Sequence, residues 1–438
     1  MVSIVRESPA PADLRRPSNT PDRAGRGRAR AWRAAVVVLL VWLAPCFARA
    51  QDDPQRRYAP PDPYTEGDEA ALRKAGYVSL GPFPFGSGHD TTAVENLLGT
   101  EPLHWIETAH FRIGCALSPL RLKGGEEDWV AKTKGELKRL SKRLPKLKPD
   151  TKELDPWLRT HLIAQRLEDL YAEVMELLGV TDASFPEVPD DPASPETFRG
   201  LGPYLGMPQK FTVLLLLRNS SHARYTRAYQ GNEMADPLRY HDIPFGCMYY
   251  GGAEETANGL FANDLALHTH LVFNVAHNLY SCYRSFSHEL PAWLPAGLAH
   301  WHARRVSPRF PTYDRKDDRD RTLRSNFWEW DKRAPGLLAN NAFEPLSAFL
   351  NRASIGEFTL EQHIESWALA DFLMDAKKEA FMAFLRAMKD PFHQRLRTPS
   401  RREVEVRQHD LLVSIFGVDA DGLEKQWRAY VLNQRGRK

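Results

Sequence analysis

The clearest periodic pattern in the chain is a stripe of apolar residues between residues 156 and 178. It repeats at the three- and four-residue spacing of one helix face, at Ile163, Leu167, Leu170, Val174 and Leu178. Asp155 is suited to the N-cap, Pro156 to the first helical turn, and Gly179 to the position that follows the last turn. The pattern therefore predicts a helix over residues 156–178 with its apolar face in the core.

Shorter apolar segments predict strands. Residues 110–117 (HFRIGCAL) alternate between polar and apolar side chains, as a half-buried strand does. Residues 211–217 (FTVLLLL) form a continuous apolar run, which indicates a buried strand, and residues 245–250 (FGCMYY) are expected beside it at the sheet edge. From residue 265 onward the pattern is mostly helical. Together these segments predict an α+β fold that is mainly helical.

The first fifty residues have the pattern of a secretory signal peptide. An apolar run of 11 residues, 34–44, is preceded by basic residues and followed by Pro45. The small-residue pair Ala48 and Ala50 then predicts cleavage after residue 50. The run is shorter than the roughly 20 residues that a membrane span requires. We therefore expect export to the periplasm, the cell envelope or the exterior, with no transmembrane span in the mature chain.

Composition excludes several classes of protein. Hydrophobic residues make up 42% of the chain and charged residues 26%, the balance of a globular protein with a core. The net charge is +3, but the first 35 residues hold eight arginines against three acids, so the rest is close to neutral and no nucleic-acid partner is expected. The cysteines beyond residue 50 are too few for a disulfide framework, and their pairing is left open: Cys115, Cys247 and Cys282.

Candidate chemistry concentrates in residues 265–306, which hold six histidines, and this density first suggests a metal. A catalytic zinc helix carries two histidines four residues apart, with a glutamate directly after the first that serves as the base. In the predicted helix over residues 271–280, Phe273 and Asn274 stand where that histidine and glutamate would be. His277 holds the second histidine position. The segment looks like a zinc helix with two chemical residues replaced.

Two later segments likewise resemble a known pattern in which one residue is replaced. Residues 290–301 (LPAWLPAGLAHW) resemble "LPxWLxEGLAEY", whose glutamate binds zinc, and Ala296 stands in its place. Residues 365–373 (ESWALADFL) resemble a helix of the form "YxQSWALVxFL", with His363 in the place of the tyrosine. Both patterns belong to the peptidase-MA-like gluzincin metallopeptidases of exported bacterial proteins, so the chain is similar to that family.

The resemblance extends over most of the chain. Residues 416–431 (FGVDADGLEKQWRAYV) are similar to the family's terminal "FGxDxxxLExxWxxYV", and residues 107–113 (ETAHFRI) to its opening strand. It implies a gluzincin-like domain with a small mixed sheet over residues 105–438, with an insertion around 120–205. Residues 51–104 would then be a tether and N-terminal segment, because residues 51–68 are polar and rich in proline.

The resemblance also implies a loss of activity. Of the three metal ligands and one base in the family pattern, only His277 remains, and catalytic zinc takes three protein ligands. We therefore expect no catalytic residue, no bound metal and no other cofactor. The expected function is that of an exported, inactive zinc-metallopeptidase homologue acting as a binding or scaffold module. No residue identifies the protein, peptide or polymer that it would bind.

The alternative is a metal-dependent peptidase or other hydrolase with a rearranged site. His300 follows Ala296 by one helical turn, so His277, His300 and either His270 or His363 could form a displaced zinc site. This alternative requires three ligand atoms within about 2.0–2.2 Å of one point.

A binding module and a scaffold predict different clefts. A binding module requires an open cleft with exposed aromatic side chains, for which Trp293 and Trp301 are the candidates. A purely structural protein predicts instead that Phe273 and its neighbours fill the cleft. The exposure of these side chains therefore separates the two possibilities.

Overall fold

The computed structural model describes residues 59–122, 126–191, 198–286, 290–310, 329–389 and 399–433. They belong to one compact unit, Arg57–Lys438. The predicted signal peptide, residues 1–50, lies outside the described residues. The unit has the predicted α+β composition, mainly helical with a small mixed sheet. Within the described ranges, no helix has the length and apolar character needed to cross a bilayer.

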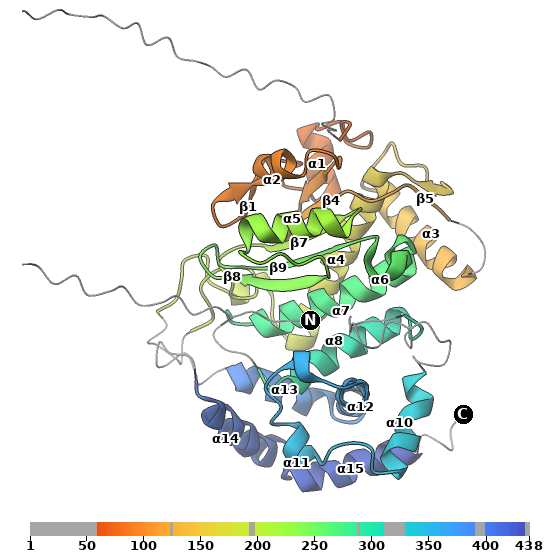
Figure 1. The fold of residues 1–438 in the computed structure, drawn as a ribbon. Coiled ribbons are helices and arrows are strands. Elements are labelled where there is room, and N and C mark those ends of the chain that lie inside the picture. Colours follow the sequence, from red (N-terminus) through yellow and green to blue (C-terminus); the bar gives the residue numbers. More distant parts are fainter. Residues whose placement is uncertain are drawn as a thin grey trace, which may run out of the picture. The chain divides into compact units, whose positions relative to one another are not determined.

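A five-stranded sheet organises the first part of the domain (Figure 1), in the order β3-β4-β7-β9-β8. In that order the strands are His104–Glu107, Phe111–Cys115, Phe211–Leu216, Cys247–Ala253 and Leu238–Asp242. The three central strands are parallel, and each edge strand is antiparallel to its neighbour. The prediction for residues 245–250 was right in placing them beside β7. It was wrong in placing them at the edge, because β8 folds back through a short hairpin and covers that side.

The central strand β7 is buried on both faces. Its odd-numbered apolar residues belong to the larger core, which it shares with α4 (Pro156–Leu178) and α7 (Asp264–Cys282). Its even-numbered apolar residues belong to a smaller core with α2 (Thr91–Leu98) and α5 (Asn219–Tyr229). Figure 1 shows α5 on one side of the sheet and α4 and α7 on the other. A strand covered on both faces needs apolar side chains at successive positions, which explains the continuous run in the sequence.

The predicted helix is α4 (Pro156–Leu178), and both of its ends are where the sequence places them. The Asp155 carboxylate accepts a hydrogen bond from the backbone N–H of Leu158 at 2.9 Å. Gly179 ends the helix in the left-handed region with a φ of 66°, which costs least for glycine. The helix lies within residues 120–205, so this expected insertion supplies a large part of the core.

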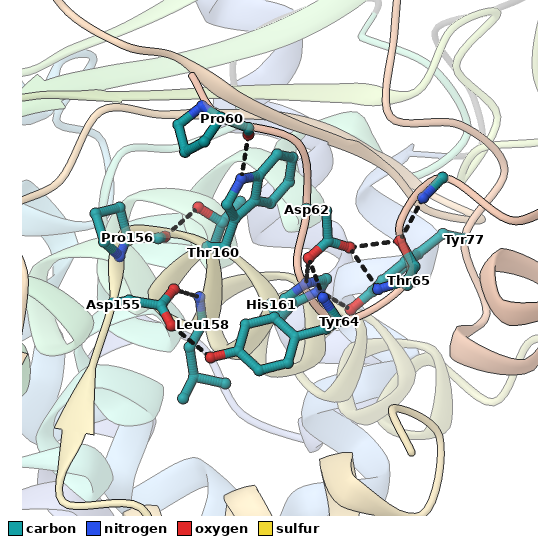
Figure 2. Close-up of polar contacts among 12 residues, drawn as sticks. Pro60, Asp62, Tyr64, Thr65, Tyr77, Asp155, Pro156, Leu158, Thr160 and His161 are labelled. Atoms are coloured by element: carbon teal, nitrogen blue, oxygen red, sulfur yellow. Dashed lines mark hydrogen bonds and ion pairs between the residues drawn. The ribbon is translucent and has the colours of Figure 1, made fainter. Parts of the chain in front are cut away.

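Residues 59–68, for which the composition predicts a tether, instead pack on the first turns of α4 (Figure 2). The Trp157 indole N–H donates to the carbonyl of Pro60 at 2.7 Å, and His161 Nε2 lies 3.1 Å from Asp62 Oδ1. The other nitrogen of His161 bonds the Tyr77 hydroxyl at 2.8 Å. The side chains of Asp62 and His161 are fully buried. The segment is ordered because α4 offers it these polar partners, which composition alone does not reveal.

The other elements complete the described parts of the chain. Before and around α4 lie α1 (Glu69–Ala75), β1 (Pro84–Gly86), β2 (His89–Asp90), α2 (Thr91–Leu98), β5 (Leu120–Arg121), α3 (Glu127–Ser141), β6 (Glu153–Leu154) and η1 (Asp182–Ser184). After β7 come α5 (Asn219–Tyr229), α6 (Thr256–Gly259), η2 (Leu260–Ala262), α10 (Trp330–Ala339), α11 (Leu346–Phe349), η4 (Ile355–Glu357), α13 (Lys378–Lys389), α14 (Arg401–Leu411), η6 (Leu412–Phe416) and α15 (Ala420–Asn433). The three described cysteines are all buried and free, so no bridge joins them.

Three further helices, α7 (Asp264–Cys282), α8 (Trp293–Val306) and α12 (Leu360–Ala376), form the layer that holds the candidate site. Helix α8 lies between α7 and α12 and packs against both. Gly297 permits a close approach of α8 and α12, since a Cβ at this position would lie 2.5 Å from the carbonyl oxygen of Ser366. The segments that resemble the metallopeptidase pattern, residues 271–280, 290–301 and 365–373, thus lie on neighbouring helices.

Candidate functional site

The site begins on α7, a helix that is buried along almost its whole length. Asn263 caps it by accepting a hydrogen bond from the N–H of Ala266. Phe273 and His277 are four residues apart and therefore lie on the same face, one turn apart. Their rings are 6.5 Å apart between centroids. The segment whose spacing suggested a zinc helix is thus helical. The phenyl ring of Phe273 stands where the first histidine was expected.

The neighbouring helices bring the other predicted residues to the same place. The ring of His300, on α8, lies 4.5 Å from that of Phe273 between centroids. His300 Nε2 lies 3.0 Å from Nδ1 of His363 on α12, at hydrogen-bonding distance. Ala296, one turn before His300, is fully buried and adds no polar atom. Residues from three separate motifs therefore converge on one buried point.

Phe273 occupies the middle of this arrangement and has no exposed surface. The His300 ring covers it from one side. The guanidinium carbon of Arg239, which comes from the edge strand β8, lies 5.8 Å from the Phe273 ring centroid. A cation near an aromatic ring is attracted by the negative potential of its face. An apolar ring with these contacts occupies the space between His300 and Arg239.

Asn274 and His270, one turn apart on α7, bond each other and the sheet. The Asn274 amide nitrogen is 2.9 Å from the backbone oxygen of His270 and 3.0 Å from its Nδ1. The Tyr250 hydroxyl, from β9, lies 2.8 Å from the same Nδ1. His270 is thus committed to a hydrogen-bond cluster under the sheet. It does not join His277 and His300, as one version of the rearranged zinc site would require.

The electrostatics of the site disfavour additional positive charge. Burial lowers the pKa of His277 well below its ordinary value, and the positive charge of Arg239 lowers it further. Burial also lowers the pKa of His300 well below the ordinary value, with His363 and Arg304 acting in the same direction. Both imidazoles are therefore neutral at physiological pH.

A small cavity remains beside His277, with a volume of about 40 Å³. Four polar side chains line it, those of Arg239, His277, Ser281 and Ser354. Ser281 Oγ is 3.4 Å from His277 Nδ1. The rest of the lining is mainly apolar and includes Met248, Phe286, Leu290, Ala292, Pro295 and Ile355. Ligand pockets for drug-sized molecules usually measure 300–1,000 Å³. This cavity therefore suits only a few atoms.

The two tryptophans expected at a cleft lie elsewhere. Trp293 is 1% exposed, packs against Phe381 and donates its indole N–H to the side chain of Gln408 at 2.8 Å. Trp301 is half-buried beneath the guanidinium of Arg305. Neither is among the residues that line the cavity at His277. The two side chains therefore do not form the walls of this cavity.

The remaining histidines of this segment also have partners outside the site. His302 Nε2 lies 2.8 Å from the Tyr280 hydroxyl, and His268 stacks on Trp129. His288 lies outside the described residues. Across the described ranges, no three His, Cys, Asp or Glu side chains come together in a way that could hold a metal ion.

Arg239 is the site residue that the sequence did not reveal. It lies in a short strand far from the histidine-rich segment, in a sequence, Leu-Arg-Tyr-His-Asp, that matches no motif. The sequence offers one hint of this role. Arg239 is a charged residue in a strand next to a buried strand, where its side chain has little access to water. The antiparallel pairing of Arg239 with Tyr250 of β9 places it over α7.

Comparison with known proteins provides no relative from which a function could be transferred. No protein-family model, curated protein or solved structure matches the chain.

Proposed function

We propose that the protein is an exported, catalytically inactive relative of the zinc metallopeptidases that acts as a scaffold or binding module. The observation that carries the proposal is the burial of Phe273 among α7, α8 and α12. A phenyl ring has no lone pair with which to bind a metal, and zinc hydrolysis requires a metal held by three protein ligands. Export rests on the leader pattern of residues 1–50.

The polar groups around Phe273 support the same conclusion. His300 and His363 satisfy each other at 3.0 Å, and Asn274 uses its amide on His270. An amide is not a base near neutral pH, so it cannot replace the glutamate that activates water. These residues contribute to a packed interior, which favours a scaffold over a module that opens a large cleft.

The first test is the zinc content of the purified chain after incubation with zinc and removal of the excess, measured by elemental analysis. We expect no zinc above background, in the wild type or in a His277→Ala control. About one zinc per chain that is lost in the control would overturn the proposal, because it would require a metal site built on His277.

A second test rebuilds the family pattern. The triple variant Phe273→His, Asn274→Glu, Ala296→Glu adds the missing ligands and base around His277. If α7 and α8 have the geometry of a metallopeptidase, this variant binds about one zinc per chain. The matched control adds His277→Ala to the triple variant and should lose the metal. A correctly folded triple variant, with wild-type circular dichroism, that binds no zinc would refute the relationship to metallopeptidases.

A further inference from the structure

The cavity beside His277 has the lining of an anion site. Among the described residues that line the cavity, only Arg239 carries a full charge at neutral pH. Its side chain is held inside the protein, with 5% of the residue exposed. A buried guanidinium keeps its charge and presents a planar set of N–H donors. The Ser281 hydroxyl can donate a further hydrogen bond into the same space.

The charge of Arg239 influences several neighbouring side chains. The charge of Arg239 acts on three imidazoles, adding to the effect of burial in lowering the pKa of His270, His277 and His300. A catalytic metal would supply positive charge at such a site, and here the guanidinium over Phe273 supplies it. The site therefore attracts an electron-rich group although it has lost the ligands for a metal.

The size of the cavity limits what that group can be. A volume of about 40 Å³ is several times the roughly 10–15 Å³ that one water needs. A carboxylate, with three heavy atoms, fits this space, whereas an aromatic ring or a sugar does not. Exposed Ala353 and half-exposed Ser354 and Ile355 form part of the wall, so the cavity is reached from solvent on their side. The apolar remainder of the lining suits a methyl or methylene group next to the carboxylate.

We propose that this cavity binds a small carboxylate, either as a free anion or as the C-terminus of a peptide, through Arg239 with His277 and Ser281 beside it. Arginine binds carboxylates through two parallel N–H···O bonds, which gives both affinity and orientation. The proposal rests on the proposed function, since a metal-free site is its premise. It adds the chemistry of the ligand that the inactive site would take.

The test is an NMR titration of the chain labelled at its histidine side chains, with sodium acetate added at constant ionic strength against sodium chloride. The His277 signal is assigned from its absence in His277→Gln. We expect a saturable shift of this signal, with a dissociation constant of the order of millimolar, and no such shift of exposed His409. No shift of His277 beyond that with chloride would overturn the proposal.

Variants test the role of the guanidinium. Arg239→Met keeps the volume of the side chain but removes its charge, and should weaken acetate binding by about 10-fold or more, as expected for loss of a charge-assisted hydrogen bond. Arg227→Met, on the surface of α5, is the matched control and should leave binding unchanged. Equal affinity in a folded Arg239→Met variant would overturn the proposal. If that variant does not fold, the wild-type titration with acetate and the peptides decides.

Two peptides distinguish the source of the carboxylate. Tetra-alanine with a free C-terminus should shift the His277 signal if the cavity accepts chain ends, and the same peptide with an amidated C-terminus should not. Acetate binding without peptide binding assigns the site to free carboxylates, whereas equal binding of the amide would refute carboxylate recognition. Zinc is measured in the same samples. Bound zinc would contradict the proposed function, while a zinc-free chain that ignores acetate would contradict only this inference.

Discussion

Glu365, on α12, is a carboxyl group in the interior of the protein and provides the sharpest test of the packing. It has no exposed surface. One oxygen accepts a hydrogen bond from the backbone N–H of Glu344 at 3.3 Å, and the other has no partner among the described residues. Burial raises its pKa to about 9. The N–H of Glu344 opposes this shift, and the carboxylates of Glu344 and Glu424 reinforce it. The group is therefore protonated at neutral pH in the folded chain.

The sign of the pH effect follows from proton counting. In the unfolded chain Glu365 ionises near its ordinary pKa of 4.5, so between about pH 5 and about pH 9 the folded state holds one more proton. The free energy of unfolding then falls as the pH rises, by about 1.4 kcal/mol per pH unit. From pH 6 to pH 8 the loss is about 3 kcal/mol. Glu365→Gln cannot ionise and should remove this loss.

The assay is urea unfolding of the wild type and Glu365→Gln at several pH values between about 6 and 8, followed by tryptophan fluorescence. A protonated carboxyl and an amide have nearly the same shape, so the two chains should be of similar stability only below about pH 4.5, and at pH 6 the variant should already be more stable by about 2 kcal/mol. As the pH rises, the free energy of unfolding of the variant should increase relative to that of the wild type by about 1.4 kcal/mol per pH unit. Glu361→Gln, in the half-exposed first turn of the same helix, is the control and should follow the wild type.

A stability difference between the wild type and Glu365→Gln that does not change with pH would refute this reasoning. It would mean that Glu365 is ionised in the folded protein and has a cationic or hydrogen-bonding partner. The glutamine variant would then be less stable at every pH.

Three other perturbations test the packing. Phe273→Ala should lower the free energy of unfolding by about 3–5 kcal/mol, measured in urea, because it opens a cavity in the core; a loss below about 1 kcal/mol would show that the ring is not confined. Asp62→Asn should cost about 1–3 kcal/mol near pH 7 because it weakens the buried contact with His161, and exposed Asp150→Asn should cost nothing measurable. Burial, the largest cause, opposes ionisation of Asp62, but His161, Thr65 and the Tyr64 N–H together outweigh it and lower the pKa of that carboxyl. The benefit should therefore disappear as the pH falls below about 4. The buried cysteines, with thiol pKa values raised by burial, should resist a thiol reagent in the folded chain and react when it is denatured, and rapid labelling of the native protein would contradict their burial.

Local signals in the sequence determined the elements and some of their chemistry. The ends of α4 are predictable because the cap at Asp155 and the left-handed Gly179 act on their own backbone neighbours. The absence of a metal-binding side chain at Phe273 and Ala296 is a fact of the sequence. These features depend on residues within a few turns of one another, where spacing and side-chain chemistry are sufficient.

Only the tertiary structure decided which groups surround those positions. Arg239 reaches Phe273 because β8 folds back along β9, and Glu365 is protonated because neighbouring segments cover it. Asp62 meets His161 because an expected tether lies on α4 (Figure 2). Such contacts join segments that are distant along the chain. Their energies depend on burial and on the sum of nearby charges, and neither is encoded in the spacing of any single motif.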